Sequence, residues 1–368
     1  MTYDLELSHL SKVFENGTVA VDDFNLQVSK GEFIAFLGPS GCGKTTTLRM
    51  IGGFEEPTQG TVTIAGRVVN HLPPEARPTS MIFQNYALFP HMNVRRNVEY
   101  GLRVRKVPPK ERRSRVNDIL EKLDLTAIAD SSLDGLSGGQ RQRVALARGL
   151  AVEPDILLLD EPLGALNAEL RKRIQTELRY LQRKLGNTFI FVTHAQSEAL
   201  AMADRVVVMN RGRLEQVAEP ETLYTQPCTG FVARFIGRNS ILPGSLVSCD
   251  DEIATVLTAF GHLRGRLIEQ DRSGGRQVNL VVPSEVMEIY PELSSRDLSL
   301  MAQYQGNVVP GVVRAETVVG YLVVYEVGVG DALTIEVESH VDKYGTAFPA
   351  GTPVCVTWLP AHGQVVSA

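Results

Sequence analysis

Residues 38–45, with the sequence GPSGCGKT, constrain the fold of this chain more than any other segment. They fit the pattern GxxxxGK[ST], they follow the apolar run Phe33–Leu37, and they lead into Lys44–Phe54, which has the pattern of a helix. A short uncharged run that ends at a glycine is typical of a buried strand. Between a strand and a helix, glycines let backbone N–H groups turn inward around phosphate oxygens, and the start of the helix adds positive potential. The sequence therefore predicts a phosphate-binding loop in an α/β domain, and the flanks weigh against a merely structural glycine-rich turn.

The side chains of this loop suit a nucleoside triphosphate and its metal ion. Lys44 is placed to reach the β and γ phosphates, and the Thr45 hydroxyl offers a ligand to Mg²⁺. The predicted phosphate-contacting residues are Gly38, Pro39, Ser40, Gly41, Cys42, Gly43, Lys44, Thr45 and Thr46.

Two carboxylates, Asp160 and Glu161, follow a second apolar run, Ile156–Leu159. Ligands of open α/β sheets bind where the parallel strands end, so both side chains are expected beside the phosphate loop. Asp160 suits the Mg²⁺ shell, and Glu161 is placed to orient and deprotonate a water that attacks the γ-phosphate. An acid pair on its own has a structural alternative, because carboxylates are also common at the N-terminus of a helix, where they interact favourably with the helix dipole. Together with the phosphate loop, the pair predicts a catalytic site.

Strands and helices alternate after these carboxylates, as they do in a doubly wound α/β sheet. The predicted elements are helix Ala168–Leu185, strand Phe189–Val192, helix Glu198–Met202 and strand Arg205–Met209. Before the carboxylates, from about residue 85 to 150, long charged amphipathic stretches predict a helical subdomain. We therefore predict one nucleotide-binding α/β domain over residues 1–236.

Beyond Gly237 the helical periodicity disappears. Short valine-rich runs, separated by Gly, Pro, Asp and Ser, are typical of a small β-barrel domain. These runs are Val278–Val282, Val308–Val313, Leu322–Val327, Leu333–Val337 and Val354–Trp358. The sequence predicts a second, all-β domain over residues 237–368.

Charge and cysteine content narrow the class of protein. The chain has 37 Lys and Arg against 42 Asp and Glu, a net charge of −5, which disfavours a protein that coats nucleic-acid backbones. Its 4 cysteines are scattered and form no CxxC pair, so neither a disulfide framework nor a zinc site is predicted. The acidic start, MTYDLELSHL, is unlike a signal peptide, and no run approaches the ~18 apolar residues of a membrane span. We expect a protein of the reducing cytosol.

A second anion site is predicted at Leu136–Gln140, with the sequence LSGGQ. Ser137 can cap the helix that follows, and Gly138 and Gly139 expose its N–H groups; a plain capped helix is the alternative. A single nucleotide does not need two such sites, and here the sequence resembles the ATPase subunits of ABC transporters. The resemblance implies that Ser137, Gly138, Gly139 and Gln140 complete the site of the opposite subunit in a head-to-tail homodimer, with ATP and Mg²⁺ as cofactors.

The remaining motifs of that family occur in order along practically the whole chain. Gln84, in FQNY, is similar to the Q-loop glutamine, which implies Mg²⁺ coordination and positioning of water. His194, in TH, is similar to the switch histidine, which implies a bond to a phosphate oxygen; without the resemblance, a structural histidine is the alternative. Phe14 matches the position on which the family stacks adenine, although an aromatic residue at a strand end is also often core.

The segment Tyr86–Met92 presents apolar and aromatic groups in a loop-like setting. The resemblance implies that this surface holds the coupling helix of a membrane permease. It also implies two permease subunits as partners and, indirectly, an external solute-binding protein. Packing between subdomains is the alternative. On this interpretation the chain is peripheral to the cytoplasmic face of the inner membrane.

Two positions depart from the family pattern. Asn167, in GALN, stands where the D-loop of the family normally ends in Asp, and Ala195 follows the histidine where Asp is common. The first departure bears on communication between the two sites of a dimer. A tolerant turn that accepts Asn and Asp alike is the alternative.

The β-rich tail resembles the transport-associated OB-type domain of importer ATPases for sugars, polyamines and ferric iron. Residues 181–237 are most similar to polyamine-importer subunits, which implies spermidine or putrescine as the solute, with sugar and ferric iron as alternatives. A soluble ABC-type ATPase that acts on DNA or ribosomes usually has two cassettes or a long coiled-coil insert, and neither such an insert nor a basic patch is evident. Few aromatic residues alternate with Lys or Arg in the tail, so no nucleic-acid partner is expected.

Overall fold

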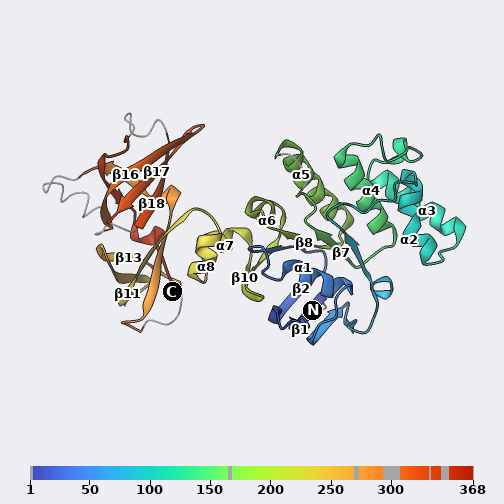
Figure 1. Cartoon of the computed structure of the whole chain (residues 1–368), viewed down its shortest axis with the longest axis horizontal. Coiled ribbons are helices and arrows are strands. Elements are labelled where there is room, and N and C mark those ends of the chain that lie inside the picture. The colour runs from blue at the N-terminus through green and yellow to red at the C-terminus, as the bar shows by residue number, and fades with distance from the viewer. Residues whose placement is uncertain are drawn as a thin grey trace. The chain divides into compact units, whose positions relative to one another are not determined.

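The computed structural model describes residues 3–164, 168–268, 273–292, 307–330, 333–340 and 348–367. The chain divides into two compact units, Met1–Pro220 and Glu221–Ala368, and each is described by itself (Figure 1). None of the helices within the described residues is both long and apolar enough to cross a membrane.

A six-stranded sheet in the order β10-β9-β3-β8-β7-β6 forms the centre of the first unit. Strands β3 and β8 are buried at every residue, as expected for parallel strands covered on both faces. The edge strand β10 is antiparallel to β9, and the other pairs are parallel. This sheet confirms the predicted α/β class. The strands are β3 (Phe33–Leu37), β6 (Thr79–Ile82), β7 (Ile156–Asp160), β8 (Thr188–Thr193), β9 (Arg205–Asn210) and β10 (Arg213–Ala218).

A second, antiparallel sheet in the order β2-β1-β4-β5 packs against the first. Alternate residues of β1, such as Leu5 and Leu7, share one apolar cluster with Phe36 of β3 and Leu48 of α1. The cluster fixes α1 between the sheets, and therefore fixes the loop that precedes it. The strands are β1 (Tyr3–Val13), β2 (Val19–Ser29), β4 (Gln59–Ile64) and β5 (Arg67–Val68).

The helices of the first unit fall into two groups. Helices α1 (Lys44–Gly52), α5 (Ala168–Leu185) and α6 (Gln196–Met202) belong to the sheet layers. Helices α2, α3 and α4 form a group of their own in Figure 1. Helix α4 contacts the edge strand β6. The predicted helical character of this region is thereby confirmed. The bounds are α2 (Val94–Val104), α3 (Pro109–Lys122) and α4 (Gly138–Ala151).

The second unit is built mainly of strands, as the sequence predicts. Five strands close into a barrel in the order β11-β12-β13-β20-β14, and five more form a sheet in the order β15-β19-β16-β17-β18. The barrel strands are β11 (Asn239–Asp250), β12 (Ile253–Thr258), β13 (Gly261–Leu267), β14 (Gln277–Pro283) and β20 (Gln364–Ser367). The sheet strands are β15 (Glu288–Pro291), β16 (Val308–Val319), β17 (Leu322–Val329), β18 (Leu333–His340) and β19 (Pro353–Thr357).

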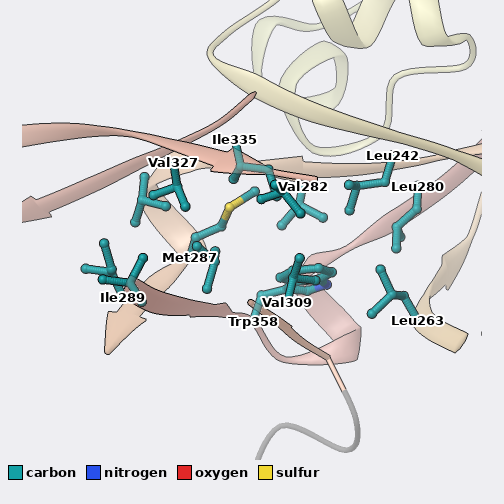
Figure 2. Close-up of a cluster of buried hydrophobic side chains, with 14 of the residues drawn as sticks. Leu242, Leu263, Leu280, Val282, Met287, Ile289, Val309, Val327, Ile335 and Trp358 are labelled. Atoms are coloured by element: carbon teal, nitrogen blue, oxygen red, sulfur yellow. The ribbon is translucent and has the colours of Figure 1, made fainter. Parts of the chain in front are cut away.

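One apolar core serves both the barrel and the sheet. Figure 2 shows the labelled side chains of Leu263 and Leu280 from the barrel and of Val309 and Ile335 from the sheet in a common interior. Trp358, which follows β19, is fully buried in the same cluster. The barrel and the sheet are therefore a single folding unit.

Two short helices, α7 (Pro220–Thr225) and α8 (Gly230–Phe235), precede the barrel. Ala233 of α8 is buried in a small cluster with residues of β14 and β20, and its carbonyl oxygen accepts a hydrogen bond from Asn239 Nδ2. Gln364 Nε2 donates to the carbonyl oxygen of Thr225. These contacts explain why the structure divides the chain between residues 220 and 221, whereas the sequence predicts the division after residue 236.

Candidate functional site

Four neighbouring parallel strands bring the predicted catalytic segments to one edge of the sheet. Their order is β3-β8-β7-β6, and their ends are in register, with Leu37 opposite Thr193 and Asp160 opposite Val192. The phosphate loop follows β3, the predicted switch histidine follows β8, the carboxylate pair ends β7, and the predicted Q-loop glutamine follows β6. Such an edge is where open α/β sheets bind ligands.

The loop of residues 38–45 joins β3 to α1, and its shape requires glycine. Gly41 and Gly43 have φ values of 77° and 99°, in the left-handed region that other residues rarely adopt. A Cβ on Gly43 would lie 2.3 Å from the carbonyl oxygen of Ala20 in β2. The loop therefore lies directly against the antiparallel sheet, in a conformation suited to an anion-binding nest.

Lys44 folds its side chain back over this loop. Its Nζ donates to the carbonyl oxygens of Gly38 at 2.7 Å and Pro39 at 2.9 Å, and it lies 3.7 Å from Cys42 Sγ. The residue is only 6% exposed, and no carboxylate within the described residues pairs with it. The ammonium is held beside the loop by neutral groups, so its charge remains for a phosphate.

Asp160 and Thr45 lie together where β7 meets the first turn of α1. Their side chains are hydrogen-bonded, and burial raises the pKa of the Asp160 carboxyl, an effect that Arg49 opposes and the charge of Glu161 reinforces. A carboxylate and a hydroxyl are hard oxygen ligands of the kind that Mg²⁺ prefers. A divalent cation there would favour the ionised carboxylate that burial disfavours. The pair therefore fits Mg²⁺.

Within the residues that the structure describes, no group of three or more His, Cys, Asp or Glu is arranged to hold a metal ion by itself. Two protein ligands are nevertheless sufficient for Mg²⁺ in nucleotide sites, because this ion usually takes its other ligands from water and substrate phosphates.

Glu161 contacts both of the other predicted catalytic side chains. Gln84 Nε2 donates to Glu161 Oε2 at 3.1 Å, and His194 Nδ1 lies 3.6 Å from Glu161 Oε1. The side chains of His194 and Glu161 are 61% and 29% exposed, so water and substrate can reach them. The structure thus brings three residues from three different strand ends into one cluster.

The backbone of Glu161 is unusual for a residue with a long side chain. Its φ is 46°, in the left-handed region, where its N–H donates to the carbonyl oxygen of Val192 at 3.1 Å. Its own carbonyl oxygen accepts from the N–H of Gly164 at 3.2 Å. Such a conformation costs on the order of 1–2 kcal/mol and persists only where the surrounding bonds impose it.

A buried acid that the sequence analysis missed supports the segment around His194. Glu198 is 3% exposed; its Oε2 accepts from Thr193 Oγ1 at 2.6 Å, and its Oε1 lies 3.4 Å from Arg171 Nε in α5. Thr193 Oγ1 in turn accepts from the N–H of Ala195 at 3.0 Å. Both neighbours of His194 are therefore fixed by one ion-paired carboxylate. The sequence signal that could have identified Glu198 is its position as a charged residue on the apolar face of a predicted helix.

The predicted signature segment forms the N-terminus of α4. Ser137 Oγ accepts from the N–H of Gln140, and Gln140 Oε1 accepts from the N–H of Ser137 at 2.8 Å, a complete capping box. Helix α4 lies away from α1 in Figure 1, and no hydrogen bond within the described parts of the chain joins the segment to the phosphate loop. Asn167 of the predicted D-loop lies outside the described residues.

Phe14 lies in the turn between β1 and β2. Two backbone hydrogen bonds close the turn, from the N–H of Phe14 to the carbonyl oxygen of Thr18 and from the N–H of Gly17 to the carbonyl oxygen of Phe14, and Phe14 is 38% exposed. Lys12 Nζ lies 5.4 Å from the ring centroid. The exposure of Phe14 argues against the alternative that it is a core residue. Strand β2 begins just after this turn, and the carbonyl oxygen of its residue Ala20 lies beside the phosphate loop.

The segment Tyr86–Met92 is tied to the helical group. Tyr86 and Ala87 have φ values of 59° and 46°, and their carbonyl oxygens each accept a 2.6 Å hydrogen bond from the guanidinium of Arg148 in α4. The same guanidinium lies 5.5 Å from the centroid of the Phe89 ring. The sequence does not distinguish Arg148, because a single arginine in a helix has the same local pattern as an arginine exposed to solvent.

Asn97 of α2 anchors the other end of that segment. It is fully buried; its Oδ1 accepts from the N–H of Phe89 at 2.9 Å, and its Nδ2 donates to the carbonyl oxygens of Phe89 and Met92. Phe89 also packs against Tyr100, with ring centroids 4.4 Å apart. The aromatic groups of the segment therefore contribute to subdomain packing.

A groove of about 440 Å³ lies beside this segment. It is lined on one side by residues of the sheet domain, among them Phe54 and Met81, and on the other by residues of the helical group, among them Tyr100 and Arg148. Phe89 lies at its wall. The groove is largely apolar and open to solvent, so it suits a helix or loop of another protein.

Comparison with protein families gives two matches. Residues 21–164 match the ABC transporter family, and residues 294–366 match the TOBE domain. The chain is 43% identical to the spermidine/putrescine import ATP-binding protein PotA of Lawsonia intracellularis, over 96% of this chain and 95% of that protein. It is 41% identical to the PotA protein of Thermobifida fusca, over 98% and 93% of the two chains.

Solved structures resemble the first unit. CbiO1 from Clostridium perfringens, part of the ABC transporter complex CbiONQ, is 29% identical, with a TM-score of 0.56 over 61% of this chain and 91% of that one. The ATP-binding cassette MJ0796, in a dimeric post-hydrolysis state bound to ADP and phosphate, is 32% identical, with a TM-score of 0.51 over 59% and 98%. With the strand-end cluster, these matches show that the chain belongs to the family of ATP-binding, ATP-hydrolysing subunits of ABC importers.

Proposed function

We propose that two copies of this chain bind and hydrolyse ATP between them and so drive the import of a polyamine through a membrane permease. The observation that carries the catalytic part is the contact of Gln84 and His194 with Glu161, at the strand ends that also hold the phosphate loop. These residues are far apart in the sequence, and a shared edge of the sheet gives them a common target.

Each residue of the cluster has a defined task in this proposal. Glu161 accepts a proton from the attacking water, and Gln84 orients the carboxylate and that water through its amide. His194 bonds to a γ-phosphate oxygen, which neutralises developing charge and reports the loss of that phosphate.

The phosphate loop positions the substrate. Lys44 moves its ammonium from the carbonyl oxygens of Gly38 and Pro39 to the β and γ phosphates, and the loop N–H groups bind the remaining oxygens. Thr45 and Asp160 would hold Mg²⁺, which when bound neutralises the charge of the phosphates. Phe14 offers an exposed ring on which adenine stacks.

A second copy completes the site. The capping box leaves the N-terminal turn of α4 preformed, and its remaining N–H groups are free to bind an anion from another molecule. Dimeric structures of the similar cassette MJ0796 support this arrangement. We infer a head-to-tail homodimer in which Ser137, Gly138, Gly139 and Gln140 contact the nucleotide of the partner.

The groove beside Tyr86–Met92 is the proposed docking site for the permease. Its two walls belong to the sheet domain and the helical group, so a partner helix lodged there senses their relative motion. The chain then works as a peripheral protein at the cytoplasmic face of the membrane, with two permease subunits and an external solute-binding protein. The name of the CbiO1 structure, part of a transporter complex, supports a permease partner.

Spermidine or putrescine is the proposed solute. The support is similarity to PotA proteins over nearly the whole chain, including the β-rich unit. Uptake of labelled spermidine by cells with and without this chain tests the assignment. Loss of spermidine uptake with unchanged maltose and ferric-iron uptake is expected; the reverse pattern would assign another solute.

Two substitutions test the catalytic proposal. Lys44→Ala should abolish hydrolysis and weaken ATP binding, whereas Glu161→Gln should retain ATP affinity and lose at least about a hundredfold in hydrolysis rate, because only the base is removed. Glu121→Gln, an exposed change on α3, is the matched control and should hydrolyse ATP normally. Hydrolysis by Glu161→Gln at the wild-type rate would refute the assignment of the base.

A further inference from the structure

The exposed surface of α2 and α3 has a strong positive charge that the proposed function does not use. Residues 94–117 contain nine Lys or Arg and two Glu, although the whole chain has a net charge of −5. The patch is not evident in the sequence, because apolar and neutral residues interrupt these cations along the chain.

The acidic residues of this segment are already paired. Glu99 forms an ion pair with Arg112 at 2.5 Å, and Glu111 forms one with Arg115 at 2.6 Å. Arg95 is paired with Asp130 at 3.5 Å. Six cations remain that are exposed and form no ion pair within the described residues. They are Arg96, Arg103, Arg105, Lys106, Lys110 and Arg113.

Helix geometry places two of these cations on the same side of α2, and a shared hollow extends the charged surface to α3. Successive residues turn by about 100°, so Arg96 and Arg103 of α2 point in nearly the same direction, roughly 10 Å apart along the axis. Arg113 of α3 lines a polar hollow together with Arg95 and Glu99 of α2, which joins the two helices into one surface. This spacing is close to the Debye length of ~8 Å at physiological salt, so the charges act together on a large anionic partner.

Apolar groups border the charged face. Tyr100 is 38% exposed and Val104 is 57% exposed, and both line the groove from α2. Aromatic and aliphatic groups beside long cationic side chains are the composition of surfaces that lie at the membrane–water boundary.

We propose that this basic surface of α2 and α3 binds the anionic phospholipid headgroups of the membrane beside the permease. The location rests on the proposed function in one respect, because the adjoining groove is the proposed permease site and a permease lies in the membrane. Charge complementarity favours lipid, since unpaired cations spread over two helices match a diffuse anionic surface.

Vesicle binding by the full chain, without permease and without ATP, tests the proposal. Wild type should float with phosphatidylcholine vesicles that contain phosphatidylglycerol, should not float with phosphatidylcholine alone, and should dissociate as salt is raised. The variant Arg96→Gln, Arg103→Gln, Lys110→Gln, Arg113→Gln should bind the anionic vesicles about tenfold more weakly or worse.

A matched control changes the same charge elsewhere in the first unit. Lys30→Gln, Arg67→Gln, Lys172→Gln and Arg183→Gln replace four exposed cations outside α2 and α3, and this variant should bind vesicles like wild type. Normal ATP hydrolysis by both variants in solution verifies that they are folded.

Three results would overturn the proposal. They are absence of wild-type binding to anionic vesicles, equal losses in the two variants, and normal vesicle binding by the α2–α3 variant with loss of permease-dependent activity, which would assign the surface to an acidic protein segment. The vesicle assay contains neither permease nor nucleotide, so failure here leaves the proposed transport function standing. Failure of ATP-driven transport, conversely, leaves the vesicle result unchanged.

Discussion

Removal of the Arg148 guanidinium is the most informative perturbation outside the catalytic cluster. Arg148 bonds the carbonyl oxygens of Tyr86 and Ala87 and lies against the Phe89 ring, so it holds the segment that borders the proposed permease groove. We expect Arg148→Met to release this segment, to lower stability, and to weaken the response of hydrolysis to the permease.

The size of the effect follows from the contacts. Hydrogen bonds to charged groups contribute about 1.5–3 kcal/mol each, and the cation–π contact adds about 0.5–2 kcal/mol. Two effects reduce this loss of stability. When the segment is freed, Tyr86 and Ala87 leave their left-handed backbone conformations, which relieves about 1–2 kcal/mol of strain at each residue. The cost of burying the guanidinium is also removed. Burial does lower the pKa of Arg148, in line with that cost. A net loss of roughly 2–4 kcal/mol is therefore expected.

Thermal unfolding of the isolated chain measures the first effect, and hydrolysis with and without reconstituted permease measures the second. A loss of that size corresponds to a fall in Tm of about 4–16 °C for a unit of this length. Arg148→Lys keeps the charge but offers a point donor in place of the planar fork, so about half the loss is expected. Arg143→Met on the same helix is the control, because Arg143 pairs with Glu177 away from the groove. An unchanged unfolding midpoint in Arg148→Met, or equal uncoupling in the control, would refute this reasoning.

Three further outcomes are expected. Burial raises the pKa of Asp160, so ionisation of this carboxyl reduces the stability of the folded state as pH rises through that pKa. Asp160→Asn should therefore raise the Tm at pH 7, raise it less at pH 4, and abolish Mg²⁺-dependent ATP binding. An unchanged Tm at both pH values would contradict this. Glu198→Ala should lower kcat about tenfold with little change in the KM for ATP, because the segment around His194 loses its support. Glu198→Gln keeps an acceptor for the Thr193 hydroxyl and should retain more activity. Equal kcat values for the two variants would argue against a role of Glu198 in positioning His194. Asn167→Asp should raise the Hill coefficient for ATP, since a charge is restored at the position that the family uses between the two sites, and superimposable rate curves would support the tolerant-turn alternative.

The sequence predicts most reliably those elements whose burial is complete. Phe33–Leu37 has no charged residue and Ile156–Asp160 has none before Asp160, and both are interior strands of the sheet. Residues of the phosphate loop are predictable because strand, glycines and lysine are consecutive. In such segments local sequence alone determines the structure.

Residues that act through distant contacts could not be predicted in this way. Nothing local distinguishes Arg148 from a solvated arginine, since its partners belong to a loop that precedes it by two helices. Glu198 gains its role only when α5 brings Arg171 beside it. The pairing of β20 with β13 and β14, which closes the barrel, joins the end of the chain to strands formed much earlier. Each case depends on the tertiary fold, which periodicity does not report.

The left-handed backbone at Glu161 sets the direction in which this protein would evolve if transport ceased to matter. Asparagine and glycine adopt such a backbone at lower cost than glutamate, so on the proposed role of Glu161 as the base, selection for hydrolysis opposes their substitution there. In gene copies released from that selection, position 161 should drift toward Asn or Gly early, and those inactive descendants should melt at higher temperature than the parent. A substitution at position 161 together with a higher Tm would then mark the branch of the family tree on which transport was lost.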